Sequence, residues 1–179
     1  MSALCLVSLL IAGACSGARS APGCRMSQLG VSAGPYVSEA TEQHTLALRL
    51  VNRGTQECVL YGYPRVTIHD ARGLIPFRIR HDGDQMISAR PAKPVDVRPG
   101  RSAFLLLNKN VCVDGASRAA TTVELATPRA AGSGVASFRF PRKMPFPYRI
   151  PDFCARADDP GSIITVSPFV PTVRAALNG

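Results

Sequence analysis

The residues of this sequence that could carry out chemistry are few and lie far apart. Residues 30–34 (GVSAG) match G-x-S-x-G, the turn that presents the nucleophilic serine of α/β-hydrolases, and Asp70 and His81 follow in the order of a catalytic triad. That turn joins a strand to a helix beside a parallel sheet, whereas no alternation of strands and helices follows residue 34. We therefore interpret the match as a small-residue loop and expect no enzymatic activity, with a serine hydrolase using Ser32 as the alternative.

The sequence predicts neither a metal nor a cofactor. His81, Asp82 and Asp84 place an imidazole and two carboxylates on one loop, but a calcium loop needs further acidic positions that are absent here. The six cysteines contain no C-x-x-C pair, which argues against a zinc site and against a thioredoxin-like redox motif. A phosphate-binding loop and a dinucleotide-binding fingerprint are also missing.

Four separated cysteines are expected to form two disulfide bonds instead. Cys24, Cys58, Cys112 and Cys154 make an even set, and disulfides are the usual state of such a set in an exported protein. Four cysteines allow three pairings. We prefer the sequential pairing, Cys24–Cys58 and Cys112–Cys154, in which each bond closes a loop of roughly 35 to 45 residues and contributes about 3 to 4 kcal/mol.

The N-terminal segment predicts export. Residues 3–14 (ALCLVSLLIAGA) are uncharged and apolar, too short for a transmembrane helix and typical of a secretory signal, although the positive charges that usually precede such a segment are missing. We assign residues 1–21 to the signal peptide and the start of a tether. Residues 22–179 then form one disulfide-linked domain, either lipid-anchored at the outer face of the membrane or secreted.

The point at which the signal is cut has two interpretations. The residues before Cys15 resemble a bacterial lipobox, with Ala12 where leucine is usual, and lipidation of Cys15 would leave no odd thiol in an oxidising compartment. Ordinary cleavage after Ala14 or Ser20 also fits the preference for small residues. We favour lipidation of Cys15.

The segments that must position these residues read as short β-strands separated by turns. Only residues 114–120 suggest a short helical turn, and no segment has a long helical period. The pattern predicts an all-β, immunoglobulin-like sandwich of two antiparallel sheets, with short strands and no second domain. The predicted strands are 44–51, 57–61, 65–70, 74–81, 95–97, 102–107, 121–126, 135–140 and 162–167.

A hairpin and the net charge together predict a basic face. Strands 65–70 and 74–81 would pair around a turn at residues 70–73, so that Arg65 lies opposite Arg78 and one face carries Arg65, Arg78 and Arg80. The net charge of +9 favours an anionic partner such as anionic lipid, a wall polymer or another envelope protein. Because no basic run is present, we expect no binding to nucleic acid, and a solvated basic surface is the simpler interpretation.

Three tyrosines offer a different kind of surface. Tyr61, Tyr63 and Tyr148 could line a site for a sugar or a peptide. The simpler interpretation is that their rings pack in the core with the hydroxyl groups at its rim.

The sequence resembles an exported actinobacterial family catalogued as domain of unknown function 4232. The resemblance covers roughly residues 24–168, and its implications are an immunoglobulin-like sandwich, a location in the cell envelope and commonly a lipid anchor. It implies no activity. The residues that carry it are Asn52 to Gly54, Cys58 to Pro64, Asp70, Gly73, Arg98 to Gly100 and Ala103.

Three functions remain in competition. The chain is a noncatalytic envelope module that binds a protein, a wall glycan or a lipid head group, a hydrolase using Ser32, or a structural spacer. The lack of a convergent acid, base and nucleophile favours the first over the second. A contiguous, exposed patch of Arg65, Arg78 and Arg80 would favour the first over the third.

Overall fold

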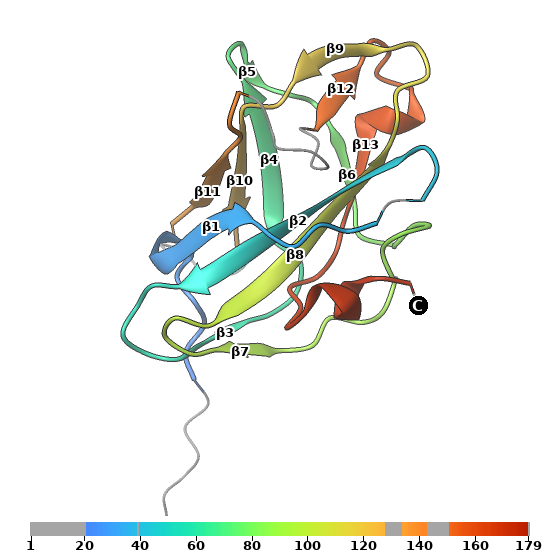
Figure 1. Cartoon of the computed structure of the whole chain (residues 1–179). Coiled ribbons are helices and arrows are strands. Elements are labelled where there is room, and N and C mark those ends of the chain that lie inside the picture. The colour runs from blue at the N-terminus through green and yellow to red at the C-terminus, as the bar shows by residue number, and fades with distance from the viewer. Residues whose placement is uncertain (1–20, 39, 128–133, 143–150, 179) are drawn as a thin grey trace, which may run out of the picture.

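Two long strands form the centre of the structure. The computed structural model describes residues 21–38, 40–127, 134–142 and 151–178 (Figure 1). β2 (Gln43–Asn52) pairs with β8 (Ser102–Asn110) in antiparallel register from Gln43 opposite Asn110 to Val51 opposite Ser102. They belong to a five-stranded sheet in the order β1-β2-β8-β13-β6. Its other members are β1 (Leu29–Ala33), β13 (Ile163–Val166) and β6 (Arg78–Arg80).

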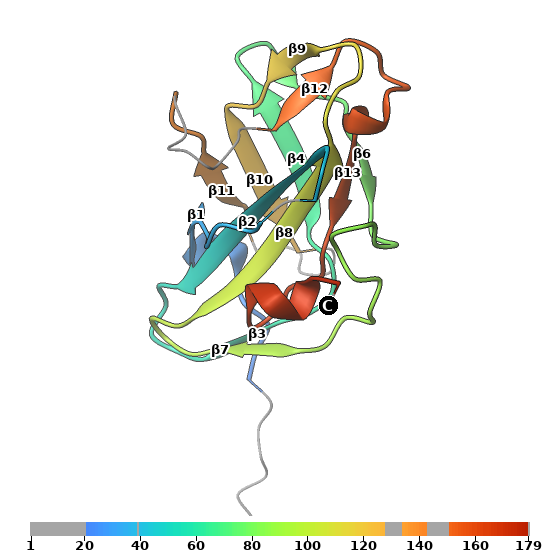
Figure 2. The same cartoon turned by 45° about the vertical axis from the view of Figure 1, so that its right-hand side comes forward.

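A second sheet of four strands faces the first. Its order is β11-β10-β4-β5, and the bounds are β11 (Ala136–Arg139), β10 (Thr122–Ala126), β4 (Arg65–Asp70) and β5 (Gly73–Leu74). Two small antiparallel pairs lie at opposite ends of the molecule (Figures 1 and 2). They are β9 (Ala116–Ala119) with β12 (Asp152–Cys154), and β3 (Cys58–Leu60) with β7 (Val95–Val97).

The described helices are three short 3₁₀ turns. They are η1 (Met26–Gln28), η2 (Pro160–Ser162) and η3 (Val173–Ala176). Over the described residues, no helix has the length and apolar character that a membrane span requires. The prediction of an all-β sandwich is therefore confirmed.

Alternating side chains fill the space between the two sheets. Leu48 and Leu105 of the five-stranded sheet and Ile68 of the four-stranded sheet are fully buried there. This is the apolar face that the alternation in residues 44–51 predicts. The core between the sheets is the main hydrophobic cluster of the described chain.

A smaller apolar cluster covers the opposite face of β2 and β8. Ala47 and Leu106 point into it, and the C-terminal segment supplies Val170 and Ala176. Main-chain hydrogen bonds of 2.8 and 3.0 Å link Phe104 and Val170 in both directions. η3 therefore lies over β8, as both views show (Figures 1 and 2). Burial on both faces explains the continuous apolar run in residues 102–107.

The predicted hairpin is correct only near its turn. Asp70 pairs with Gly73, and the N–H of Ile75 donates to the carbonyl of Ile68 at 2.8 Å. The next residue is Pro76, which has no N–H to continue the ladder. The chain then crosses to the five-stranded sheet, where β6 pairs in parallel with β13. The expected position of Arg65 opposite Arg78 is therefore wrong, and β6–β13 departs from the expected antiparallel arrangement.

Three segments form strands that the sequence did not predict. Residues 29–33 were expected to be a loop but pair with β2, because β2 offers a free edge to an extended neighbour. Residues 116–119, expected to be a helical turn, pair with residues 152–154 as β9 and β12. In both cases a partner distant in the sequence, which a local pattern does not contain, determines the conformation.

The predicted disulfide pairing is confirmed. Cys24 is bonded to Cys58, which fixes the N-terminal segment to β3. Cys112 is bonded to Cys154, which fixes the segment after β8 to β12. Each bond thus joins a small two-stranded sheet to another part of the chain.

Candidate functional site

The structure divides the predicted basic face between the two sheets. Arg65 lies on β4 beside Ala126, whereas Arg78 and Arg80 lie on β6. The guanidinium of Arg80 donates to both carboxylate oxygens of Asp82 at 2.9 and 2.7 Å, and this hydrogen bonding raises the pKa of Arg80. The three arginines therefore do not share one sheet face, and Arg80 already has a carboxylate partner.

Arg78 lies within electrostatic range of one carboxylate, that of Asp158. Hydrogen bonding by Arg156 and, to a smaller extent, the charge of Arg78 lower the pKa of Asp158. Arg78 is therefore close enough to a carboxylate for part of its field to be neutralised.

Ser32 lies within a strand and not on a turn. It is an exposed residue of β1 and pairs with Arg49 across to β2. Asp70 is bound to Arg118, and the ring of His81 stacks on Tyr63 with the ring centroids 4.6 Å apart. The strand–turn–helix geometry of a nucleophile elbow is therefore not found at residues 30–34.

The carboxylates of the loop after β6 bind protein groups. Asp82 accepts from Arg80, as described above. One oxygen of Asp84 accepts from the main-chain N–H groups of Met86 and Ile87, and the other accepts from Asn108 at 2.8 Å. Within the described ranges no three His, Cys, Asp or Glu side chains are grouped as metal ligands would be.

Two of the three tyrosines lie in the described part of the chain, and one of these two is at the surface. Tyr61 is 59% exposed, whereas Tyr63 is half-buried against His81. Tyr148 and Cys15, for which the sequence also made predictions, lie outside the described residues.

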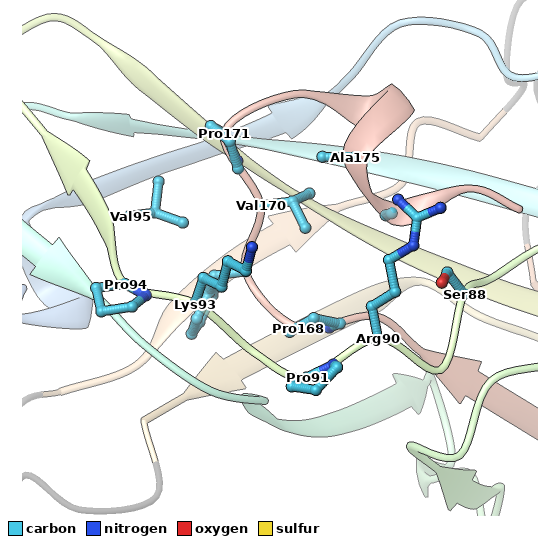
Figure 3. A pocket seen from close by; sticks show the side chains of 12 residues that line it. Ser88, Arg90, Pro91, Lys93, Pro94, Val95, Pro168, Val170, Pro171 and Ala175 are labelled. Atoms are coloured by element: carbon cyan, nitrogen blue, oxygen red, sulfur yellow. The ribbon is translucent and has the colours of Figure 1, made fainter. Parts of the chain in front are cut away.

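An apolar pocket opens between the loop before β7 and the C-terminal segment. Figure 3 shows the side chains that line it. Its volume is about 280 Å³. Its apolar lining includes Val95, Phe169 and Val170. Four prolines stand around it, namely Pro91, Pro94, Pro168 and Pro171. Because proline rings fix the backbone φ angle and carry no N–H, these walls are stiff and offer few hydrogen-bond donors. We call this cavity the proline pocket.

Two cations line the proline pocket, and a third lines the hollow beside it. Lys93 and Arg90 reach from the loop toward the C-terminal segment (Figure 3). A wider hollow of about 620 Å³ adjoins the pocket, sharing Arg90 and Ala175 with it and adding Arg174. Among the described residues, no carboxylate lies within ion-pair distance of Lys93, Arg90 or Arg174. We call these three residues the cationic row.

Tyr61 stands next to the same pocket. It follows Leu60, which pairs with Val95 of the pocket lining. The N–H of Phe169, also in the lining, donates to the carbonyl of Gly62 at 3.0 Å. The backbone of Tyr61 therefore lies next to residues of the pocket lining, and its side chain is exposed.

A second cavity, of about 320 Å³, is polar and lies at the other end of β8. Gln43 and Lys109, both buried, help to line it. Asn108 donates to Gln43 at 2.6 Å and to Asp84 at 2.8 Å, and Lys109 donates to Asp152 at 2.7 Å. Buried polar groups need hydrogen-bond partners, and these groups supply them to one another. We therefore interpret this network as structural.

Comparison with known proteins identifies the family. A family model described as "Domain of unknown function (DUF4232)" matches residues 24–170, most of the chain. The chain belongs to the DUF4232 family. No curated protein and no solved structure matches it.

The structure explains why two motifs of this DUF4232 domain occur together. The side chain of Asn52 donates to the carbonyls of Gln56 and Val97 and accepts from the N–H of Gly54, each at 2.8 Å. Its own carbonyl accepts from Gly100 at 2.8 Å, and Gly100 has a φ of 74°, which glycine adopts without strain. The Asn52–Gly54 and Pro99–Gly100 motifs are therefore two halves of one structural contact.

The cationic row was not predicted from the sequence. Its residues come from a loop and from the C-terminal segment, which the sequence separates by about 80 positions. One local signal was present: Arg90, Lys93 and Arg174 all lie close to the prolines that form the pocket. The matched range ends at residue 170, so Arg174 lies beyond the DUF4232 match.

Proposed function

We propose that this DUF4232 domain is an exported, noncatalytic binding module of the cell envelope, held at the membrane by a lipid on Cys15. Its ligand is anionic and binds at the cationic row beside the proline pocket. The observation that carries this proposal is a grouping of three cations that have no carboxylate partners among the described residues, two of them in the lining of an apolar cavity and the third in the adjoining hollow. The two disulfide bonds are compatible with an oxidising compartment.

Charge and apolar area have separate roles in this proposal. The net charge of +9 attracts anionic partners over a distance of about 10 Å at ordinary salt and raises their rate of encounter. Exposed ion pairs contribute little each, about 1 kcal/mol or less. The apolar pocket supplies the part of the affinity that salt does not screen.

Support for a noncatalytic role comes from what the candidate catalytic groups contact. Asp70 is bound to Arg118, and Ser32 lies within an edge strand. We expect Ser32→Ala to leave any hydrolysis of ester and peptide substrates at its background level. Hydrolysis by the native protein that disappears in Ser32→Ala would contradict the proposal.

Binding tests the proposal directly. The triple variant R90A/K93A/R174A should lose binding to anionic phosphatidylglycerol vesicles, wall fragments or acidic peptides. The triple variant R65A/R78A/R80A removes the same charge from β4 and β6 and should bind as the native domain does. Equal losses in both variants would mean that net charge alone determines binding, with no defined site.

Intact mass measurement of the natively expressed protein tests its location. We expect the mass of a diacylglycerol on Cys15 and a loss of two mass units for each disulfide, recovered on reduction. An unlipidated chain that begins after Ala14 or Ser20 would make the protein a free secreted one. Four free thiols would contradict export.

A further inference from the structure

We infer that the ligand of the cationic row is an acidic protein segment that inserts one large apolar side chain into the proline pocket. This inference rests on the proposed function and names its partner. The volume of the pocket and the apolar character of its walls argue against other ligands, and the position of the cations favours an acidic polypeptide.

The volume of the proline pocket suits a single side chain. At about 280 Å³ it lies just below the range of about 300 to 1,000 Å³ that drug-sized ligands occupy. A short chain of sugars or a pair of acyl chains would need more enclosed space. An aromatic or large aliphatic side chain would bury most of its surface there, as the central anchor of a protein interface does.

The chemistry of the walls argues against a glycan. Sugars bind through many hydroxyl groups, each of which needs a donor or acceptor in place of water. Four of the residues that line the pocket are prolines without an N–H, and its other apolar residues include Val95 and Val170. A sugar in this pocket would therefore lose hydrogen bonds to water and gain few in return.

The cations and the adjacent tyrosine match a polypeptide. Lys93 and Arg90 stand beside the pocket, and Arg174 continues the row over the adjoining hollow. A chain whose apolar anchor is flanked by Asp or Glu could place its carboxylates along this row. Arginine and tyrosine are the residues enriched at the centres of protein interfaces, and Arg90 and the exposed Tyr61 supply both.

The experiment selects peptides from a random library displayed on phage, with the full disulfide-bonded domain as bait. We expect the selected sequences to share one large apolar residue within two positions of at least two acidic residues. Synthetic peptides of that sequence should bind the native domain, and R90A/K93A/R174A should weaken them at least tenfold. R65A/R78A/R80A should leave the affinity within twofold.

A pocket-filling variant tests the anchor separately from the charge. Ala175 is an exposed residue of η3 in the pocket lining, so Ala175→Phe would occupy the cavity while the three cations remain. We expect Ala175→Phe to weaken the selected peptides at least tenfold and Ala175→Ser to leave them unchanged. Circular dichroism and thermal unfolding of each variant confirm that the fold is retained.

The other outcomes overturn the inference in distinguishable ways. Peptides that bind Ala175→Phe as well as the native domain would show charge recognition without an anchor, which contradicts this inference and leaves the proposed function standing. Vesicles or wall fragments that bind through the cationic row, with no peptide selected, would have the same meaning. If no anionic probe binds through Arg90, Lys93 and Arg174, the inference and the proposed function both fail.

Discussion

The guanidinium of Arg118 on β9 holds the carboxylate of Asp70 at the end of β4 through two hydrogen bonds of 2.6 and 2.7 Å. The same guanidinium donates to the carbonyls of Gly73 and Leu74 at 3.3 and 3.1 Å. A single side chain thus fastens β9 to the turn between β4 and β5. Such a two-point contact between arginine and a carboxylate fixes direction as well as distance.

This contact makes the stability of the fold depend on pH. The hydrogen bond from Arg118 holds the pKa of Asp70 well below its usual value of 3.8. The contribution of the ionised carboxylate is therefore complete above about pH 4 and is lost as the pH falls toward the lowered pKa. We expect Asp70→Asn to lower the Tm at pH 7. At pH 2 the difference in Tm between this variant and the native domain should be smaller. A Tm difference that stays constant over this range would contradict the assignment.

Loss of Lys109 and loss of Asp152, which form a buried ion pair, should lower the free energy of unfolding by unequal amounts. The Lys109 side chain is only 2% exposed, whereas that of Asp152 is 32% exposed. Asp152→Ala leaves a buried ammonium without its carboxylate and should cost about 3 to 5 kcal/mol. Lys109→Met leaves a carboxylate that water can reach and should cost about 1 kcal/mol or less. Urea unfolding of the two variants measures both costs, and the reverse order would show that Lys109 does not depend on Asp152.

Asn52 should be far more important to stability than its neighbour. Its side chain makes three hydrogen bonds, and the residue is fully buried. Asn52→Leu leaves these main-chain groups without that partner and should cost about 2 to 3 kcal/mol in urea unfolding. Arg53→Ala, at an exposed position, should cost about 0.5 kcal/mol or less. Similar costs for the two would mean that water replaces the amide of Asn52.

The two disulfide bonds should contribute similar amounts of stability. Cys24 and Cys58 are 34 positions apart, and Cys112 and Cys154 are 42 apart. In the chain-entropy model the contribution depends weakly on loop length, so replacing either pair by alanine should cost about 3 to 4 kcal/mol. Urea unfolding of the two double variants tests this equality. A much larger loss for one pair would show that its cysteines also stabilise the native state by packing.

Local patterns predicted the parts of the fold that local physics determines. Residues 44–51 alternate in polarity because one sheet face is buried, and the Asp70–Gly73 turn brings its own flanking residues together. Pro76 marks where the hairpin must stop, although the predicted strand ran through it to residue 81. β1 was missed because its five small or apolar residues do not distinguish a strand from a loop.

The candidate site could not be predicted in the same way. Arg90 and Arg174 become neighbours only because the C-terminal segment turns back over β8 and joins Val170 to Phe104. The predicted basic face failed for the corresponding reason, since the crossing after Pro76 carries Arg78 to the other sheet. The sequence alone gives the number of charges. The path of the chain between the sheets determines which of them lie on the same surface.

If Cys15 carries the proposed lipid, the disulfide between Cys24 and Cys58 limits how far from a bilayer this domain can reach. Cys58 lies on β3, whose partner β7 supplies Val95 to the proline pocket, so the tether begins at the end of the sandwich that holds the pocket. Eight residues lie between Cys15 and Cys24, and even a fully extended chain spans no more than about 32 Å from one to the other. With a lipid on Cys15, the pocket is confined to a thin layer above the membrane surface. On the proposed function, a partner would have to present its acidic segment within that layer.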